Sequence, residues 1–288
     1  MRASHKAGRF FVTPTALRDQ RFRGTQPKTI RKGTGMATQA LPATQVSTDE
    51  LAQINLELED ESPQTVLEWA LGRFHPDILL ASSFGGISGM ALLDMAVKIN
   101  PDVRTYYLDT DFLFPETHAL IDRTKTKYRI TPMVVKSRWT PEKQAETFGD
   151  KLWERDPDLC CNLRKVEPNE RALEGNSAWI SGLRRDQSPT RRDTPIVEWD
   201  TKFELVKVNP LATWTEEQVW AYIRENDVPY NELHESGYPS IGCTHCTLAV
   251  KPGQDLRAGR WRGFTKSECG IHAGPGGNGV APEGNAPA

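Results

Sequence analysis

Four of the five cysteines in this 288-residue chain form two pairs whose spacing could hold a metal. Cys160 and Cys161 are adjacent, and Cys243 and Cys246 form a Cys-x-x-Cys pair further along the chain. Four thiolates fit either a zinc ion or an iron–sulfur cluster. Adjacent cysteines have Cα atoms only about 3.8 Å apart, and in a helix their side chains diverge. This spacing therefore favours a cluster with several metal corners over a single zinc ion.

Two alternatives apply to the same residues. A disulfide between Cys160 and Cys161 is disfavoured, because bridges between adjacent cysteines are strained. His245 lies inside the Cys-x-x-Cys pair and could replace a thiolate as a ligand, although loop histidines are more often bystanders. The fifth cysteine, Cys269, is the odd thiol, and we expect it to be free to react.

Small residues at 82–89 could bind an anion. They follow an apolar run at 77–83 that predicts a buried strand, and they precede a predicted helix. Small residues allow backbone N–H groups to approach an anion, and the helix adds its positive N-terminal end. No Walker A sequence follows, and a simple turn is the alternative interpretation. The residues expected to contact a phosphate or sulfate are Ser82, Ser83, Phe84, Gly85 and Gly86.

The second predicted strand ends at a similar position. We expect Leu108 and Thr110 to lie beside a bound nucleotide. Asp109 and Asp111 could hold a metal or a ribose, but capping of the next helix is at least as plausible an explanation.

Basic residues cluster near the thiols in the sequence. Any one of them could belong to a solvated surface, but two sets indicate an anion clamp, because guanidinium forks match phosphate and sulfate oxygens. Cations close to Cys269 would also favour its nucleophilic thiolate form. These residues are Arg164, Lys165, Arg184, Arg185, Arg191, Arg192, Arg257, Arg260 and Arg262.

The apolar pattern predicts the elements that must position these groups. Strands are predicted at 77–83, 103–108, 132–136 and 178–182, with an antiparallel addition at 196–208. Helices are predicted at 47–58, 63–74, 88–99, 115–127, 141–147, 162–173 and 215–226, with Ser47 or Thr48 as the first N-cap. Strand–helix alternation indicates an α/β fold with a parallel sheet and helices on both faces. The loops that carry the candidate residues then meet at the carboxyl edge of the sheet.

Composition limits the class of protein. With 38% hydrophobic residues the chain can form a sizeable core, and its net charge of −2 gives no basic field for nucleic acid. No apolar run is long enough for a membrane span, and no secretory signal opens the chain. Reactive thiols require a reducing compartment, so we expect a cytoplasmic protein.

The chain ends differ from its middle. Residues 1–35 are rich in Lys and Arg before Met36, which indicates an overextended start or, alternatively, a transit peptide. We expect residues 1–45 to be disordered or not translated and residues 273–288 to be a disordered tail. Between them we expect one α/β domain at 46–256 and a mobile catalytic segment at 257–272.

Four segments together resemble the assimilatory adenylylsulfate and phosphoadenylylsulfate reductases: 160–168, 181–191, 237–247 and 257–272. The resemblance covers about residues 50 to 272. It implies an adenine-nucleotide α-hydrolase-like (PP-loop) sheet and one four-iron four-sulfur cluster on the four paired cysteines.

The resemblance also implies a reaction. Cys269 would attack the sulfur of adenylylsulfate, release AMP and become an S-sulfocysteine, from which thioredoxin or a glutaredoxin-like reductant would release sulfite. The cluster would tune charge without exchanging electrons, and self-association into a homo-oligomer is left open. The residues implied to act on the substrate are Lys165, between cluster and substrate, together with Arg184, Arg191, Arg257, Arg260 and His272.

One segment departs from the pattern of the adenylylsulfate enzymes, which usually carry Ser-Phe-Ser-Gly-Ala-Glu-Asp in the anion loop. Residues 83–89 are closer to the loop of the phosphoadenylylsulfate enzymes. Because the cluster cysteines accompany adenylylsulfate more reliably, we expect that substrate, with phosphoadenylylsulfate or dual use as the alternative. A cluster-bearing tRNA-thiolating ATP pyrophosphatase and a zinc-stapled binding module are the two other hypotheses.

Overall fold

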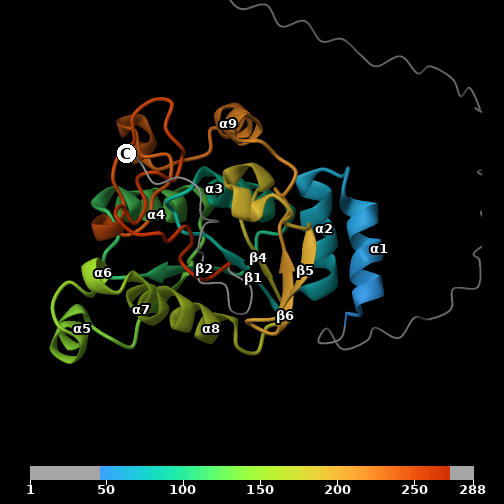
Figure 1. The fold of residues 1–288 in the computed structure, drawn as a ribbon. Coiled ribbons are helices and arrows are strands. Elements are labelled where there is room, and N and C mark those ends of the chain that lie inside the picture. Colours follow the sequence, from blue (N-terminus) through green and yellow to red (C-terminus); the bar gives the residue numbers. More distant parts are fainter. Residues whose placement is uncertain (1–45, 273–288) are drawn as a thin grey trace, which may run out of the picture. The chain divides into compact units, whose positions relative to one another are not determined.

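The computed structural model describes residues 46–272, which contain six strands in one sheet (Figure 1). The strands are β1 (Ile78–Ala81), β2 (Thr105–Asp109), β3 (Met133–Lys136), β4 (Ala178–Ile180), β5 (Val197–Asp200) and β6 (Leu205–Val208). Their order is β3-β2-β1-β4-β6-β5, and every neighbouring pair is parallel except β5 and β6. The predicted parallel sheet with an antiparallel addition is confirmed.

The helices agree with the sequence pattern except around the adjacent cysteines. They are α1 (Thr48–Leu58), α2 (Pro63–Phe74), α3 (Ile87–Ile99), α4 (Pro115–Tyr128), α5 (Pro141–Phe148), α6 (Leu152–Arg155), α7 (Pro157–Cys161), α8 (Glu167–Leu173) and α9 (Glu216–Glu225). The short helices α6 and α7 were not predicted. The single helix expected at 162–173 is divided into a π-helical turn, Asn162–Val166, and α8. Such turns are frequent at functional sites.

Side-chain caps begin several of these helices. The Ser47 hydroxyl accepts a hydrogen bond from the Glu50 backbone N–H at 3.1 Å, so Ser47 and not Thr48 is the cap of α1. Thr215 and Gln218 form a capping box at the start of α9. These contacts satisfy backbone donors that the first helical turn leaves unpaired, which is why the sequence signals were reliable.

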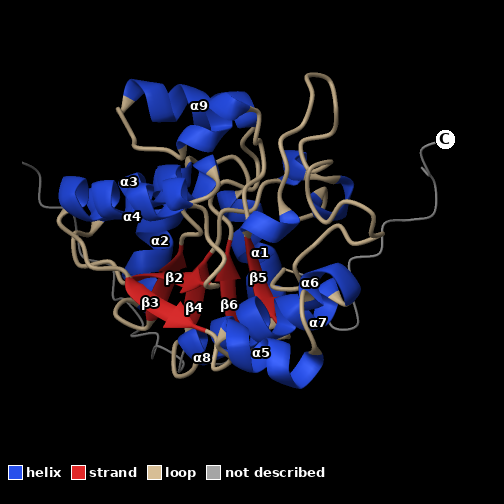
Figure 2. Ribbon diagram, turned by 90° about the vertical axis from the view of Figure 1, so that its left-hand side faces the viewer, coloured by secondary structure: helices blue, strands red, loops and turns tan. Residues whose placement is uncertain are grey.

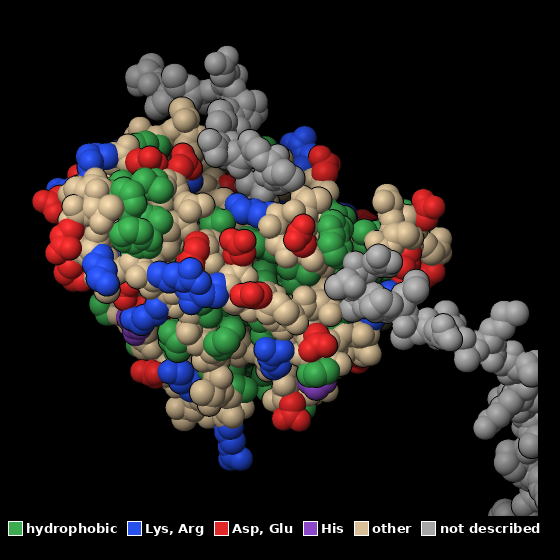
Figure 3. All heavy atoms as spheres, turned by 90° about the horizontal axis from the view of Figure 1, so that it is seen from below, with side chains coloured by type: hydrophobic (Ala, Val, Ile, Leu, Met, Phe, Trp, Pro, Cys, Tyr) green, Lys and Arg blue, Asp and Glu red, His purple; other side chains and the backbone are tan. Residues whose placement is uncertain are grey.

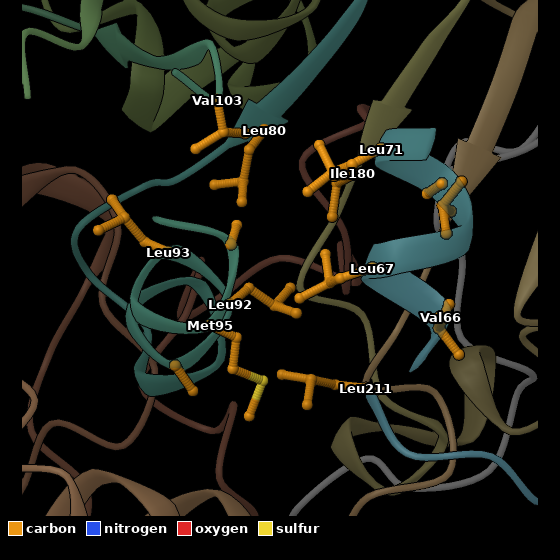
Figure 4. Close-up of a cluster of buried hydrophobic side chains, with 14 of the residues drawn as sticks. Val66, Leu67, Leu71, Leu80, Leu92, Leu93, Met95, Val103, Ile180 and Leu211 are labelled. Carbon is orange, nitrogen blue, oxygen red and sulfur yellow. The ribbon is translucent and has the colours of Figure 1, made fainter. Parts of the chain in front are cut away.

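Alternate residues of the strands enter two separate cores. Leu80 faces a core that also contains residues of α2 and α3, whereas Leu79 and Trp179 face the core on the side of α8. Figure 4 shows Leu67 from α2, Leu92 from α3 and Leu80 from β1 in this core. Figure 2 shows α3 and α4 on one side of the sheet and α5 and α8 on the other. The helices therefore cover both faces and leave the carboxyl edge for the site.

The expectations for residues 1–45 and 273–288 fall outside the described residues. Within 46–272, none of the helices combines the length and the apolar character that a membrane crossing needs. On the face drawn in Figure 3, Lys and Arg side chains are interspersed with Asp and Glu side chains and form no continuous basic surface.

Candidate active site

A cavity of about 280 Å³ lies at the carboxyl edge of the sheet. Ser82 follows β1, Thr110 follows β2 and Ser181 follows β4, and all three line this cavity. Because β1 pairs with β2 on one side and β4 on the other, the crossover connections diverge at this point. Open α/β sheets bind ligands at such a switch point.

The anion loop forms one wall of the cavity, and close packing explains its glycines. A Cβ on Gly85 would lie 2.8 Å from the backbone oxygen of Ile241. Gly86 is the N-cap of α3 and makes no side-chain cap, so the first N–H groups of that helix stay available to a ligand. Phe84 is the exception among the predicted loop residues. Its ring is fully buried, packs edge-on against Tyr107 with centroids 5.5 Å apart, and does not line the cavity.

Five cations line the cavity, and three of them form ion pairs with carboxylates. Arg184 is buried and pairs with Asp186 at 2.9 Å, whereas Arg191 and Arg257 pair with a glutamate near the thiol. Lys165 and Arg260 have no carboxylate partner in the part of the chain that the structure describes. These two are the cations of the cavity without a direct carboxylate partner.

Cys269 lines the same cavity, because the segment at residues 257–272 folds back over it. The preceding residue, Glu268, carries the carboxylate that Arg191 and Arg257 bind. On the other side of the thiol, Lys202 donates to the backbone oxygen of Gly270 at 2.6 Å. His272 also lines the cavity, and its ring stacks on Trp179 with centroids 5.6 Å apart and an interplanar angle of 2°. Both flanks of Cys269 are thus attached to the sheet domain.

Burial and charge set the protonation states of this segment. Burial opposes ionisation of Glu268, but hydrogen bonds and charge from Arg191 and then Arg257 hold its pKa below the usual value. Burial lowers the pKa of Arg257 to about 10, which leaves it charged at neutral pH. Burial, assisted by nearby cations, holds the pKa of His272 well below its ordinary value. The segment therefore carries an ionised glutamate and a neutral imidazole at neutral pH.

The four paired cysteines line a second, smaller cavity. Cys160 and Cys161 end α7, whereas Cys243 and Cys246 flank and end the 3-10 turn Thr244–Cys246. In residues 46–272, no group of three or more His, Cys, Asp or Glu side chains is arranged to hold a metal ion. The four thiols nevertheless line one common cavity, together with Phe112, Trp153 and Trp261. Two sequence-distant thiol pairs are thus brought to a common site.

The chemistry of these thiols suits a positively charged centre. Burial raises the pKa of Cys160 to about 11 and that of Cys161 to about 12. Thiols of this kind lose their protons when a cationic metal centre binds them. Lys165 lines both cavities. Burial alone would lower the pKa of Lys165, but electrostatic interaction with Cys243, Cys269 and Cys161 raises it overall.

Other candidate residues have different roles in the structure. Asp109 and Asp111 bind Lys136 at 3.1 and 2.8 Å and do not line the cavity. Neither caps α4, whose N-cap is Phe114, so the capping interpretation is wrong. The His245 ring stacks on Trp153 with centroids 3.9 Å apart, at the edge of the cysteine cavity.

Several residues that line the cavity were missed. Gly182 follows an apolar strand as Gly85 does, so the same signal could have found it. Trp179 belongs to the core on the α8 side of the sheet, and Glu268 pairs with Arg191 from a distant part of the chain. No local sequence pattern marks either residue as part of the site. The missed residues include Trp179, Gly182, Ser240, Gly242 and Glu268.

Known proteins share this architecture. Residues 77–249 match the family described as the phosphoadenosine phosphosulfate reductase domain. The adenosine 5'-phosphosulfate reductase of Halalkalibacterium halodurans is 49% identical over 76% of this chain and 95% of its own length. The phosphoadenosine 5'-phosphosulfate reductase of Gloeobacter violaceus is 47% identical over 81% and 97%. The crystal structure of phosphoadenylyl-sulfate (PAPS) reductase from Candida auris, a phosphate complex, has 38% identity and a TM-score of 0.64 over 71% of this chain and 98% of that one.

Proposed function

This chain belongs to the phosphoadenosine phosphosulfate reductase domain family, and on that premise we propose that it reduces adenylylsulfate to sulfite and AMP. One observation carries the proposal. A single cavity combines an anion-binding loop, a helix N-terminus, a cysteine thiol and two cations without a direct carboxylate partner in residues 46–272. A thiol beside an anion site suits nucleophilic attack on an activated oxyanion.

The proposed first step transfers the sulfonate group to the enzyme. The Cys269 thiolate attacks the sulfur of adenylylsulfate, a sulfur–sulfur bond forms, and the bond from sulfur to the bridging phosphate oxygen breaks. AMP leaves with that oxygen, and Cys269 becomes an S-sulfocysteine. Because anionic oxygens shield the sulfur, the attack needs cations, and Lys165 and Arg260 supply positive charge in this cavity.

The proposed second step consumes a dithiol. One thiolate of thioredoxin attacks the Cys269 sulfur, sulfite leaves, and the resulting mixed disulfide is resolved by the second thioredoxin thiol. Two electrons pass from the dithiol to the sulfonate group, and the Cys269 thiol is regenerated. This step needs Cys269 to leave the cavity, which is compatible with a segment attached by a small number of contacts. A reducing compartment such as the cytosol suits both thiol reactions.

We propose that the four paired cysteines hold a four-iron four-sulfur cluster. They share one cavity, and the adjacent pair on a helix fits separate metal corners better than one ion. When bound, the cluster would supply fixed charge beside the substrate without exchanging electrons. Lys165, which lines both cavities, would connect that charge to the sulfate end of the substrate.

Different observations favour adenylylsulfate and phosphoadenylylsulfate as the substrate. The cluster cysteines favour adenylylsulfate, whereas the loop at 83–89 resembles that of the phosphoadenylylsulfate enzymes. Relatives of both names have nearly equal identity to this chain. We keep adenylylsulfate as the substrate, and comparing turnover of the two nucleotides at equal concentration decides between them.

Replacement of the proposed nucleophile tests the function. Cys269→Ser should abolish sulfite release from adenylylsulfate and reduced thioredoxin, because serine cannot form the sulfonated thiol. Binding of AMP to this variant should persist, since the anion loop is unchanged. Sulfite release at the wild-type rate by Cys269→Ser would refute the proposal.

A further inference from the structure

A carboxylate that the proposed reaction does not use holds the residue next to Cys269. Glu268 is 5% exposed, and its Oε1 and Oε2 accept hydrogen bonds from Nε and Nη2 of Arg191 at 2.8 and 2.7 Å. Arg257 donates to the same Oε2 at 3.2 Å. This is a bidentate, charge-assisted pair reinforced by a second guanidinium, which is a strong and directional contact.

The two arginines are themselves fixed. Arg191 also donates to the Gln187 side chain, and Arg257 donates to the backbone oxygen of Ser267 at 2.7 Å. The side chain of Glu268 and the backbone before it are therefore held at once. Loss of the carboxylate would leave two buried guanidinium groups without their counter-charge, which is costly.

The position of this pair distinguishes it from the other contacts of the segment. Lys266 binds Asp158 near the cysteine site, and His272, three residues after the thiol, stacks on Trp179. Glu268 is covalently adjacent to Cys269, and both residues line the substrate cavity. Its contact with Arg191 therefore determines where the thiol lies relative to a bound nucleotide.

We propose that Glu268 is a positioning residue: its carboxylate, held by Arg191 and Arg257, fixes the Cys269 thiol against the bound substrate. The inference rests on the proposed function, in which Cys269 is the nucleophile. Arg191 and Arg257 then serve the reaction through Glu268. Lys165 and Arg260, which pair with no carboxylate in residues 46–272, meet the substrate's anionic groups directly.

Glu268→Gln removes the charge and keeps the shape. In anaerobic single-turnover reactions with adenylylsulfate, followed by mass spectrometry of Cys269, its sulfonation rate should fall about 10- to 100-fold, since small misplacements of a reacting group have effects of that size. AMP affinity should stay as in the wild type, whereas the melting temperature should fall, because two buried guanidinium groups lose their counter-charge. Alkylation of Cys269 by iodoacetamide without nucleotide should become several-fold faster, because the thiol leaves the cavity.

Matched variants complete the experiment. Glu174→Gln, at an exposed position, should behave as the wild type. Glu268→Asp should recover part of the sulfonation rate, because aspartate keeps the negative charge. If Glu268→Gln does not fold, Glu268→Asp is measured in its place. Arg191→Gln should slow sulfonation to a similar extent, and combining it with Glu268→Gln should cause little further loss.

Three results would overturn the inference. They are wild-type sulfonation and alkylation rates in Glu268→Gln, additive effects of Glu268→Gln and Arg191→Gln, and tighter AMP binding by Glu268→Gln. The last would mean that the carboxylate competes with the substrate's phosphate. A wrong assignment of the function gives a different result from a wrong assignment of Glu268. If the proposed function is wrong, the wild-type enzyme forms no sulfonated Cys269, whereas the alkylation rate still reports the position of the thiol.

Discussion

At the scale of single residues, Arg260 shows how the cavity keeps a cation oriented without neutralising it. Its guanidinium donates to the Ser240 hydroxyl at 3.1 Å and to the backbone oxygen of Cys246 at 3.3 Å, and it lies 4.4 Å above the Trp261 ring. None of these partners carries negative charge, so the positive charge remains available to an anion. The absence of a Cβ at Gly242 makes room for this arrangement.

Gly242→Ala should therefore displace the guanidinium. The added Cβ would lie 2.4 Å from Arg260 Nη2. We expect kcat/KM for adenylylsulfate to fall by about 10-fold or more, the size of a lost charge-assisted hydrogen bond. The melting temperature should change little, because the colliding atoms end a flexible side chain. Steady-state kinetics and thermal unfolding measure both effects.

Gly72→Ala is the control, because nothing lies within 4 Å of the added Cβ in the exposed face of α2. It should leave kcat/KM unchanged. A Gly242→Ala enzyme with wild-type kcat/KM would show that Arg260 does not act from this position.

At the scale of elements, residues 257–272 pack against the sheet domain without extending its sheet. Ile271 packs against the core on the α8 side, and His272 stacks on Trp179, but the segment adds no strand or helix to the sheet. Segments held by few contacts open locally at a lower free energy than the core. The same attachment can therefore hold Cys269 over the substrate and release it to a reductant.

Docking of this segment should depend on pH through His272. Its pKa is well below the ordinary value in the docked state and returns to about 6.5 when the segment is free. Between these two values the free segment binds more protons, so docking is fully stable above about pH 6.5 and weakens as the pH falls below it. Amide hydrogen exchange of residues 266–272, corrected for intrinsic rates, should be faster at about pH 5.5 than at about pH 7.5. This increase should be larger in the wild type than in the His272→Phe variant.

His118→Gln serves as the control because His118 is exposed. This variant should keep the pH dependence of the wild type. Equal exchange of residues 266–272 in wild type and His272→Phe at both pH values would contradict the assignment.

At the scale of the whole described region, the cysteine site joins segments that the sheet does not connect. Cys160 and Cys161 end α7, after β3 and the helices α5 and α6, whereas Cys243 and Cys246 come after the last strand of residues 46–272. The backbone N–H of Thr244 donates to the Phe112 oxygen at 2.9 Å, which brings the second pair back to the loop after β2. A metal centre held by both pairs would lock these segments together.

Each of the substitutions Cys160→Ser, Cys161→Ser, Cys243→Ser and Cys246→Ser should lower the iron content of anaerobically purified protein. Cys269→Ser should retain the iron, since that thiol lies in the other cavity. Removal of iron by a chelator should raise hydrogen exchange in 157–166 and 237–261 and leave β1, β2 and β4 protected, because the sheet has its own core. Iron analysis and exchange mass spectrometry test this, and zinc without iron would contradict the cluster.

The sequence alone determined the parts of this protein that depend on local pattern. Strand and helix periodicity, the Ser47 and Thr215 caps and the small residues of the anion loop are read from neighbouring positions, and they predicted the α/β sheet and the edge where ligands bind. The spacing of the cysteines also separated a possible metal set from the lone Cys269, because thiol chemistry depends on residue type.

Only the tertiary structure decided which of these residues meet. Glu268 and Arg191 lie 77 positions apart in the sequence and form a buried ion pair. The sequence around neither residue predicts this pair. The division of the expected helix at 162–173 and the burial of Phe84 beneath the loop likewise depend on packing against distant elements. Such contacts form only when elements distant in the sequence pack together. They determine how the thiol, the cations and the cysteine site are arranged.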